Sequence, residues 1–282
     1  MSCHILFIGT PEFSVPTLES LISEFNDGEI SVISMPDKVR GRGQSTSPSS
    51  VKSLAQTHQL PVYTPLTKSD LTQKIHDLSP DLIIVVAYGM IIEKQITDHY
   101  FCVNIHSSLL PQYRGASPIH TALLNGDDTT GITLIKMNEA MDEGDILVQV
   151  ELSIDPLDNL GTLTDKLSQL GAQTMIEFIH NCFLPKNITL TPQNNNMASY
   201  TKKIDKADLL LDTNENSKLL HNKIRAYSPK PGAYVIHNNK RIKIIASELI
   251  NDQLQLVKVQ PEGKPIMNYH DFLQGSPEGI QL

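Results

Sequence analysis

The chain has 282 residues, of which 40% are hydrophobic and 19% charged, a composition typical of a soluble globular protein with one large domain and a small one. No apolar run reaches the roughly 18 residues of a transmembrane helix, and the N-terminus lacks the features of a signal peptide. The three cysteines, Cys3, Cys102 and Cys182, are widely spaced, which favours free thiols in a reducing compartment. We therefore expect a cytoplasmic protein without a membrane partner.

The charge is distributed unevenly. The formal net charge is −8, which by itself argues against a nucleic-acid partner. Residues 200–282, however, carry 12 Lys and Arg against 9 Asp and Glu. An acidic protein can bind nucleic acid where its basic residues cluster, because counterion release is a local effect. The basic excess of the C-terminal third is therefore compatible with a nucleic-acid partner.

The first half of the chain alternates short apolar runs with helix-like segments. The pattern predicts strands near residues 4–8, 30–33, 61–63, 81–87 and 101–105, and helices near residues 14–25, 51–58 and 71–78. This βαβ alternation predicts a Rossmann-like, doubly wound, mostly parallel sheet. Gly9 stands alone after the first run, without the Gly-x-Gly-x-x-Gly fingerprint, so NAD binding is not expected.

Residues 36–50 are rich in Gly and Ser and include the basic residues Lys38, Arg40 and Arg42. This composition predicts a mobile, positively charged loop. A solvated surface loop and a contact for a polyanion are equally compatible with it.

The second half of the chain predicts the end of one domain and a smaller one. We expect a helix at 117–124, a strand pair at 132–135 and 146–150, and a long helix at 160–183 that closes a first domain of residues 1–190. Linker composition marks residues 191–205. A helix at 217–226 and strands near 231–235, 241–245 and 254–258 then predict a small β-rich domain over residues 206–282.

Two polar residues mark the most informative stretch. Asn104 and His106 are two apart at the end of a predicted strand, so both side chains point to one face, where open α/β sheets bind ligands. A lone His after a strand is more often a structural hydrogen-bond partner than a catalyst, and Asn104 alone would be a turn former. A Gly-flanked loop containing Asp142 follows some 36 residues on. A Ser-His-Asp hydrolase is not expected without a Gly-x-Ser-x-Gly elbow, nor a metal site without ligands at coordinating spacing.

The motif around these residues has a family likeness. Asn104-Ile105-His106-Ser107-Ser108-Leu109-Leu110-Pro111, followed by Arg114-Gly115-Ala116-Ser117-Pro118-Ile119, resembles the active-site signature of the 10-formyltetrahydrofolate-dependent formyltransferases. The likeness is greatest to the branch that acts on methionyl initiator tRNA. It extends over nearly the whole chain, from Gly9-Thr10-Pro11 to Val259-Gln260-Pro261.

The resemblance implies roles for individual residues. Asn104, His106 and Asp142 correspond to the family's catalytic residues, and Ser108, Leu109, Leu110, Pro111, Tyr88 and Gly89 to its folate-binding residues. Lys38, Arg40 and Arg42 correspond to a loop that meets the tRNA acceptor stem, although the Lys-Lys that often follows is absent. Ser107 stands where the family commonly has Gly, which would cost about 1 kcal/mol if that position needs a positive φ.

The implied fold is a Rossmann-like domain followed by an OB-like tRNA-binding domain, here shortened between Ile250 and Leu254. The implied reaction transfers a formyl group from the co-substrate 10-formyltetrahydrofolate to methionyl initiator tRNA in translation initiation. We expect no metal cofactor, and we expect the protein to be a monomer. Two alternatives remain open: an N-formyltransferase acting on an amino-sugar nucleotide, and a catalytically idle folate- or RNA-binding protein.

Overall fold

The computed structural model describes residues 3–40 and 45–282. It divides into two compact units that interleave along the sequence. The first comprises residues 1–114, 131–151 and 165–199, and the second comprises residues 115–130, 152–164 and 200–282. Each unit has its own sheet and its own buried core.

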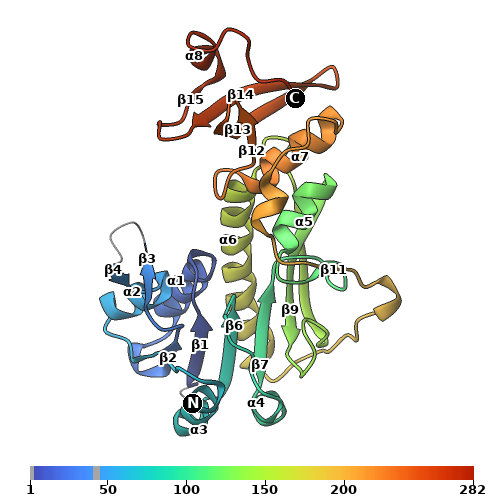
Figure 1. Ribbon diagram of the computed structural model, residues 1–282. Helices are drawn as coiled ribbons and strands as arrows, with labels where there is room; N and C mark the ends of the chain where they lie inside the picture. The colour runs from blue at the N-terminus through green and yellow to red at the C-terminus, as the bar shows by residue number, and fades with distance from the viewer. Residues whose placement is uncertain (1–2, 41–44) are drawn as a thin grey trace. The chain divides into compact units, whose positions relative to one another are not determined.

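The first unit is built on a seven-stranded sheet with the order β10-β9-β7-β6-β1-β2-β5 (Figure 1). Its strands are β1 (Ile5–Gly9), β2 (Ile30–Ile33), β5 (Val62–Tyr63), β6 (Leu82–Val86), β7 (Cys102–His106), β9 (Thr129–Lys136) and β10 (Ile146–Ser153). The strands from β7 to β5 pair in parallel, whereas β9 pairs with β7 in the antiparallel sense. The prediction of a Rossmann-like, mostly parallel sheet is confirmed.

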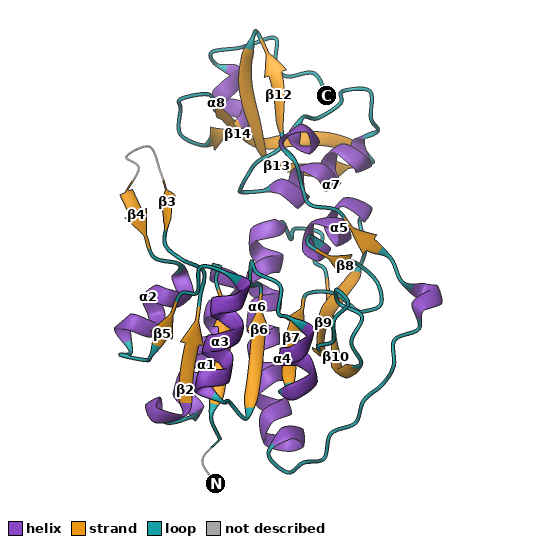
Figure 2. Ribbon diagram, turned by 60° about the horizontal axis from the view of Figure 1, so that its bottom comes forward, coloured by secondary structure: helices purple, strands orange, loops and turns teal. Residues whose placement is uncertain are grey.

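Helices cover both faces of this sheet. They are α1 (Val15–Glu24), α2 (Ser50–Thr57), α3 (Lys68–Leu78), α4 (Lys94–His99) and α6 (Leu160–Phe178), and Figure 2 shows several of them lying along the strands. Leu71 of α3 packs with Leu6 of β1 on one face. On the other face Gly171 of α6 lies so close to Ile105 that a Cβ there would be 2.9 Å from the Ile105 side chain. The fully buried strands β1 and β6 explain why their sequences are continuous apolar runs.

Three local expectations were wrong or incomplete. Within residues 36–50, where we expected a loop, β3 (Lys38–Arg40) and β4 (Ser45–Ser47) pair in the antiparallel sense. The α-helical part of the long helix ends at Phe178, and a π-helical turn continues it to Phe183. The helix α4 was not predicted, since its six residues carry little apolar periodicity.

The second unit pairs helices with a small antiparallel sheet. Its sheet has the order β12-β13-β14-β15, formed by β12 (Tyr234–His237), β13 (Lys240–Ile250), β14 (Gln253–Pro261) and β15 (Met267–Asn268). Helix α5 (Pro118–Asn125) packs against α7 (Ser217–Tyr227), and α8 (Tyr269–Leu273) packs against β14. The predicted β-rich C-terminal module is confirmed, although β15 and α8 were not anticipated.

Two tight turns shape that sheet. Asn238-Asn239 joins β12 to β13, and Asn251-Asp252 joins β13 to β14. All four residues have φ between 48° and 60°. Two-residue hairpins favour such left-handed pairs, and Asn and Asp adopt them at low cost. The second turn lies where the sequence resemblance indicates a missing stretch.

Candidate active site

Asn104 and His106 lie at the carboxyl end of β7, in the interior of the first sheet. β7 pairs with β6 on one side, where Asn104 is opposite Val85, and with β9 on the other, where His106 is opposite Thr133. Their two side chains share one face of the sheet because they are two residues apart. The placement at the strand's carboxyl end is the usual position for ligand-binding groups in open α/β sheets.

The loop between β9 and β10 brings Asp142 to both side chains. Asp142 Oδ1 lies 3.5 Å from Asn104 Nδ2 and 3.6 Å from His106 Nδ1. The His106 side chain is 6% exposed and that of Asp142 14% exposed. The structure therefore assembles the three residues that the sequence resemblance singled out, from two elements that are far apart in the chain.

The imidazole ring is held from both ends. His106 Nε2 lies 3.0 Å from the carbonyl oxygen of Tyr113, while Nδ1 faces the Asp142 carboxylate. Both neighbours are acceptors only, so a proton on either ring nitrogen has an oxygen to which it can be donated. The ring is thereby oriented, which a proton-transferring group requires.

Residues 108–111 form a preformed loop beside His106. Thr133 Oγ1 donates to the carbonyl of Ser108 (2.6 Å) and accepts from the Leu110 amide (3.1 Å). Gln149 Nε2 donates to the carbonyl of Leu110 at 2.9 Å. Ser107 does not have a positive φ, so the strain considered for a residue replacing glycine is absent. Leu110 is buried, whereas Leu109 and Pro111 are partly exposed.

Two buried hydroxyl groups lie near the carboxyl ends of the neighbouring strands. Thr10 follows β1, and Tyr88 follows β6, which pairs with both β1 and β7. Thr10 Oγ1 and Tyr88 Oη are buried and have no hydrogen-bond partner among the described residues. Burial raises the pKa of Tyr88 to about 12, so its hydroxyl stays protonated and can donate. Buried groups of this kind are uncommon and are suited to a bound ligand.

Two residues at the site were not singled out by the sequence. Arg114 is 1% exposed, and its guanidinium lies 3.1 Å from the Glu143 carboxylate and 2.8 Å from Gln193 Oε1. Gln193 in turn donates to the loop that carries Asp142. The Arg-Gly motif after Pro111 was a signal for Arg114, but nothing in the segment around Gln193 distinguishes it from a linker.

The predicted tRNA-contacting residues are only partly described. Lys38 and Arg40 are the first and last residues of β3, and Arg42 lies outside the described residues. Of the predicted folate-binding residues, Gly89 lies against Met35, and a Cβ added to it would be 3.6 Å from the Met35 side chain.

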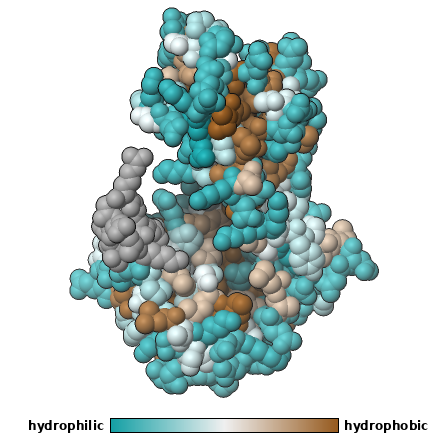
Figure 3. Space-filling view, in the orientation of Figure 1, coloured by the Kyte–Doolittle hydropathy of each residue, from teal (hydrophilic) through white to brown (hydrophobic). Residues whose placement is uncertain are grey.

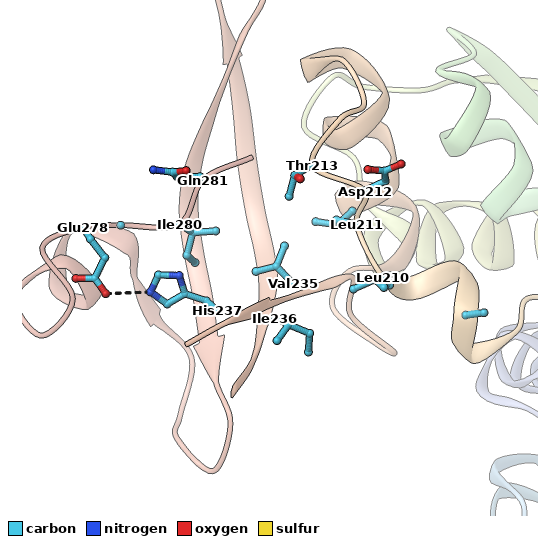
Figure 4. Close-up of a pocket in the computed structure, with 12 residues that line it drawn as sticks. Leu210, Leu211, Asp212, Thr213, Val235, Ile236, His237, Glu278, Ile280 and Gln281 are labelled. Carbon is cyan, nitrogen blue, oxygen red and sulfur yellow. Dashed lines mark hydrogen bonds and ion pairs between the residues drawn. The ribbon is translucent and has the colours of Figure 1, made fainter. Parts of the chain in front are cut away.

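A separate hollow occurs in the second unit. It has a volume of about 770 Å³ and is lined by β12, by residues 207–213 and by residues 278–281 (Figure 4). Ile236 and Leu210 are both exposed there, at 58% and 46%, and Figure 3 shows apolar surface over the C-terminal sheet. None of the predicted site residues lines this hollow.

The described residues contain no group of three or more His, Cys, Asp or Glu side chains arranged to hold a metal ion. In the same part of the chain, no helix combines the length and apolar character needed to cross a membrane.

Comparison with known proteins identifies the family. The model of the family described as "Formyl transferase" matches residues 3–179, and that described as "Formyl transferase, C-terminal domain" matches residues 203–255. The methionyl-tRNA formyltransferase of Ehrlichia ruminantium (strain Gardel) is 40% identical over 300 residues, covering 96% of this chain and 97% of its own. That of Bacillus licheniformis is 36% identical over 307 residues, covering 99% and 96%.

Solved structures show the same fold. Methionyl-tRNA formyltransferase from Clostridium thermocellum matches with a TM-score of 0.62 at 18% identity, covering 92% of this chain and 98% of that one. The sugar 3N-formyl transferase WlaRD, crystallised with dTDP and 5-N-formyl-THF, matches with a TM-score of 0.67 at 23% identity, covering 89% and 88%. The family models and the near full-length relatives agree with the signature around Asn104 and His106, and the chain therefore belongs to the formyl transferase family.

Proposed function

We propose that this chain is a methionyl-tRNA formyltransferase, which transfers the formyl group of 10-formyltetrahydrofolate to the amino group of methionyl initiator tRNA. The observation that carries the proposal is the convergence of Asn104 and His106 on the Asp142 carboxylate, within 3.6 Å. It occurs in a chain that is 36–40% identical to proteins of that name over nearly its full length.

The chemistry is acyl transfer. The amine nitrogen attacks the formyl carbon, a tetrahedral oxyanion forms, the bond from carbon to N10 of the folate breaks, and a proton passes from the amine to N10. The Asn104 amide donates a hydrogen bond to the oxyanion. His106 carries the proton, and Asp142 holds the imidazole in position.

The folate is the formyl donor and leaves as tetrahydrofolate. In the proposal, one wall of the folate site is formed by residues 108–111. Tyr88 and Gly89, which follow the neighbouring strand β6, also border the folate site. Thr133 and Gln149 already bind the carbonyls of Ser108 and Leu110, so this wall contributes shape and apolar contact. The Tyr88 hydroxyl, which has no partner in the described part of the chain, supplies a directed hydrogen bond to the ligand. These features fit a flat heteroaromatic group with polar edges.

The tRNA is assigned to basic residues outside the chemical cluster. Lys38, Arg40 and Arg42 carry positive charge on one short segment, and residues 200–282 carry a basic excess. Phosphate contacts from such residues would supply most of the tRNA affinity. An enzyme of initiator tRNA acts where translation begins, so the proposed location is the cytoplasm, and the proposed form is a monomer.

The tRNA assignment predicts a change in salt dependence. Arg42→Ala should weaken tRNA binding and make the slope of log affinity against log salt shallower by about one unit, because one phosphate contact is lost. The affinity for the formyl donor should not change. Lys68→Ala, on an exposed position of α3, is the control. Filter binding at several salt concentrations measures the slope. An unchanged slope would show that Arg42 makes no phosphate contact and that this segment is a solvated surface loop.

One assay tests the proposed function. Purified protein is incubated with radiolabelled 10-formyltetrahydrofolate and either charged initiator tRNA or amino-sugar nucleotides. Label should enter the tRNA alone, and His106→Ala should abolish most of the transfer. Label in a sugar nucleotide would favour the alternative acceptor. Folate binding without transfer to either acceptor would indicate an idle binding protein.

A further inference from the structure

We propose that Gln193 is a positioning residue for the transfer reaction, which holds Asp142 against His106 and Asn104 through its side-chain amide. This inference rests on the proposed function. It concerns a residue in a segment whose sequence has only linker composition.

The loop that carries Asp142 needs support from outside itself. Asp142 has φ of +56°, in the left-handed region that Asp adopts at lower cost than most residues. Gly144, two residues on, accepts no side chain, because a Cβ there would collide with the carbonyl oxygen of Lys136. The carboxylate is therefore presented by a tight turn with no room for a side chain at Gly144, and its position depends on what binds its backbone.

Gln193 binds that backbone at two points. Its Nε2 donates to the carbonyl oxygen of Asp142 at 2.8 Å and to that of Gly144 at 2.7 Å. Both protons of the amide are thus used on the same turn. The two carbonyls flank Glu143, so a single side chain fixes the position and direction of the whole turn.

Arg114 fixes which way the Gln193 amide faces. The guanidinium donates to Gln193 Oε1 from Nε at 3.1 Å and from Nη2 at 2.8 Å. A guanidinium has no acceptor, and backbone carbonyls have no donor, so both sides require the same orientation of the amide. Arg114 is itself almost fully buried and also contacts Glu143 on the same turn and Asn195 beside Gln193. A buried charge with this many partners is strongly held in place.

The catalytic consequence follows from the distances at the carboxylate. Asp142 Oδ1 lies 3.5–3.6 Å from its partners on Asn104 and His106, so a small displacement of the turn removes both contacts. A displacement of about 1 Å in an active-site group can reduce turnover about 10²-fold. Gln193 acts on the reaction only through Asp142, and that dependence can be measured.

The diagnostic variant is Gln193→Glu. It keeps acceptors for Arg114 but places a carboxylate oxygen against the two carbonyls, so the support of the turn is lost while the contact to the guanidinium stays. We expect kcat to fall about 10²-fold, with KM for both substrates within about twofold of wild type. Gln173→Glu, the same substitution at an exposed position of α6, is the matched control and should leave kcat unchanged.

A double-mutant cycle separates positioning from a general loss of folding. In the Asp142→Asn background, Gln193→Glu should cause no further fall in kcat, because its target has already been removed. Fully additive losses in the double variant would overturn the proposal, as would wild-type kcat in Gln193→Glu alone.

A second measurement does not depend on activity. Hydrogen exchange of residues 138–145 should be faster in Gln193→Glu than in the wild-type protein, while exchange in β1 and β6 stays the same. Unchanged exchange in residues 138–145 would contradict the proposed support. If the wild-type protein transferred formyl to no acceptor, the proposed function would fail, and the exchange result would still decide whether Gln193 holds the turn.

Discussion

Asp142 combines a chemical role with an uncommon backbone conformation, and the two can be separated by the choice of substitution. Asp142→Asn keeps a residue that tolerates φ near +56° and removes only the charge. We expect turnover to fall by about 10²–10⁴, the range for loss of a proton-transfer partner, with little change in the free energy of unfolding. Asp142→Ala should lose the same activity and about 1 kcal/mol of stability as well. Steady-state kinetics and urea denaturation of both variants make the comparison; equal stabilities would show that the turn is not strained.

His106 is expected to contribute through proton transfer and not through folate binding. His106→Ala should reduce turnover by about 10²–10⁴ while leaving the dissociation constant of the folate nearly unchanged. His58→Ala, at an exposed position after α2, is the control for loss of an imidazole elsewhere. A His106→Ala enzyme with a tenth of wild-type turnover would remove His106 from the mechanism.

At the scale of elements, α7 gives the second unit a dependence on pH. Burial, and to a smaller extent the charge of Arg225, lower the pKa of His221 from 6.5 to about 4. The ring accepts or donates a hydrogen bond with Ser247 Oγ at 2.9 Å. In the unfolded chain the same residue takes up a proton near pH 6.5, whereas the folded chain resists protonation until about pH 4. The stabilising contribution is therefore complete above pH 6.5 and is lost as the pH falls toward 4.

The lowered pKa of His221 predicts that wild type loses stability more steeply with falling pH than a variant without this imidazole. The free energy of unfolding of wild type, measured by urea denaturation, should decrease between pH 6.5 and 4 relative to that of His221→Gln. His58→Gln, which changes an exposed histidine, should follow the wild-type curve. Parallel curves for wild type and His221→Gln would show that folding does not lower the pKa of His221.

For the whole molecule, the interleaving of the two units limits where the chain can be divided. Helix α5 lies in the first half of the sequence but belongs to the second unit, where it packs against α7. Four of its residues, Pro118, Ile119, Ala122 and Leu123, are buried. A truncation before residue 200 therefore removes α7 and uncovers an apolar helix face.

We expect a fragment of residues 1–199 to fold with a lower melting temperature and to bind a hydrophobic dye more strongly than the full chain. It should retain folate binding and lose most of its tRNA affinity, because the basic excess lies after residue 200. A fragment ending at Pro192 should in addition lose the support of the Asp142 turn. Calorimetry and filter retention on both fragments measure the two affinities. Full tRNA affinity in residues 1–199 would place the tRNA site in the first half.

The sequence predicted those parts of the molecule that depend on local pattern. β1, β6 and β7 were predictable because buried parallel strands are continuous apolar runs, and the shared face of Asn104 and His106 follows from the two-residue period. The pairing of β3 with β4 was missed because their residues show no apolar alternation. It is visible only in the structure.

The sequence marked Arg114 only as part of a motif and Gln193 not at all, and the roles of both arise from distant partners. Arginine is almost never fully buried unless it is paired, and the partner here is 79 residues away in the chain. The same holds for α5, whose apolar face gives no indication of which helix will cover it. Long-range pairing of this kind leaves no periodic signal in a single sequence.

The hairpin turn at Asn251-Asp252 also bears on how the length of such chains can vary. Lengthening a flexible loop costs only about 0.6 kcal/mol of closure entropy for each doubling of its length. Residues inserted between β13 and β14 would leave the pairing of Ile250 with Gln253 and of the strands beyond it intact. Insertions at this point are therefore tolerated by the fold. Selection on the surface that a longer loop would present can then act there almost independently of selection on the core.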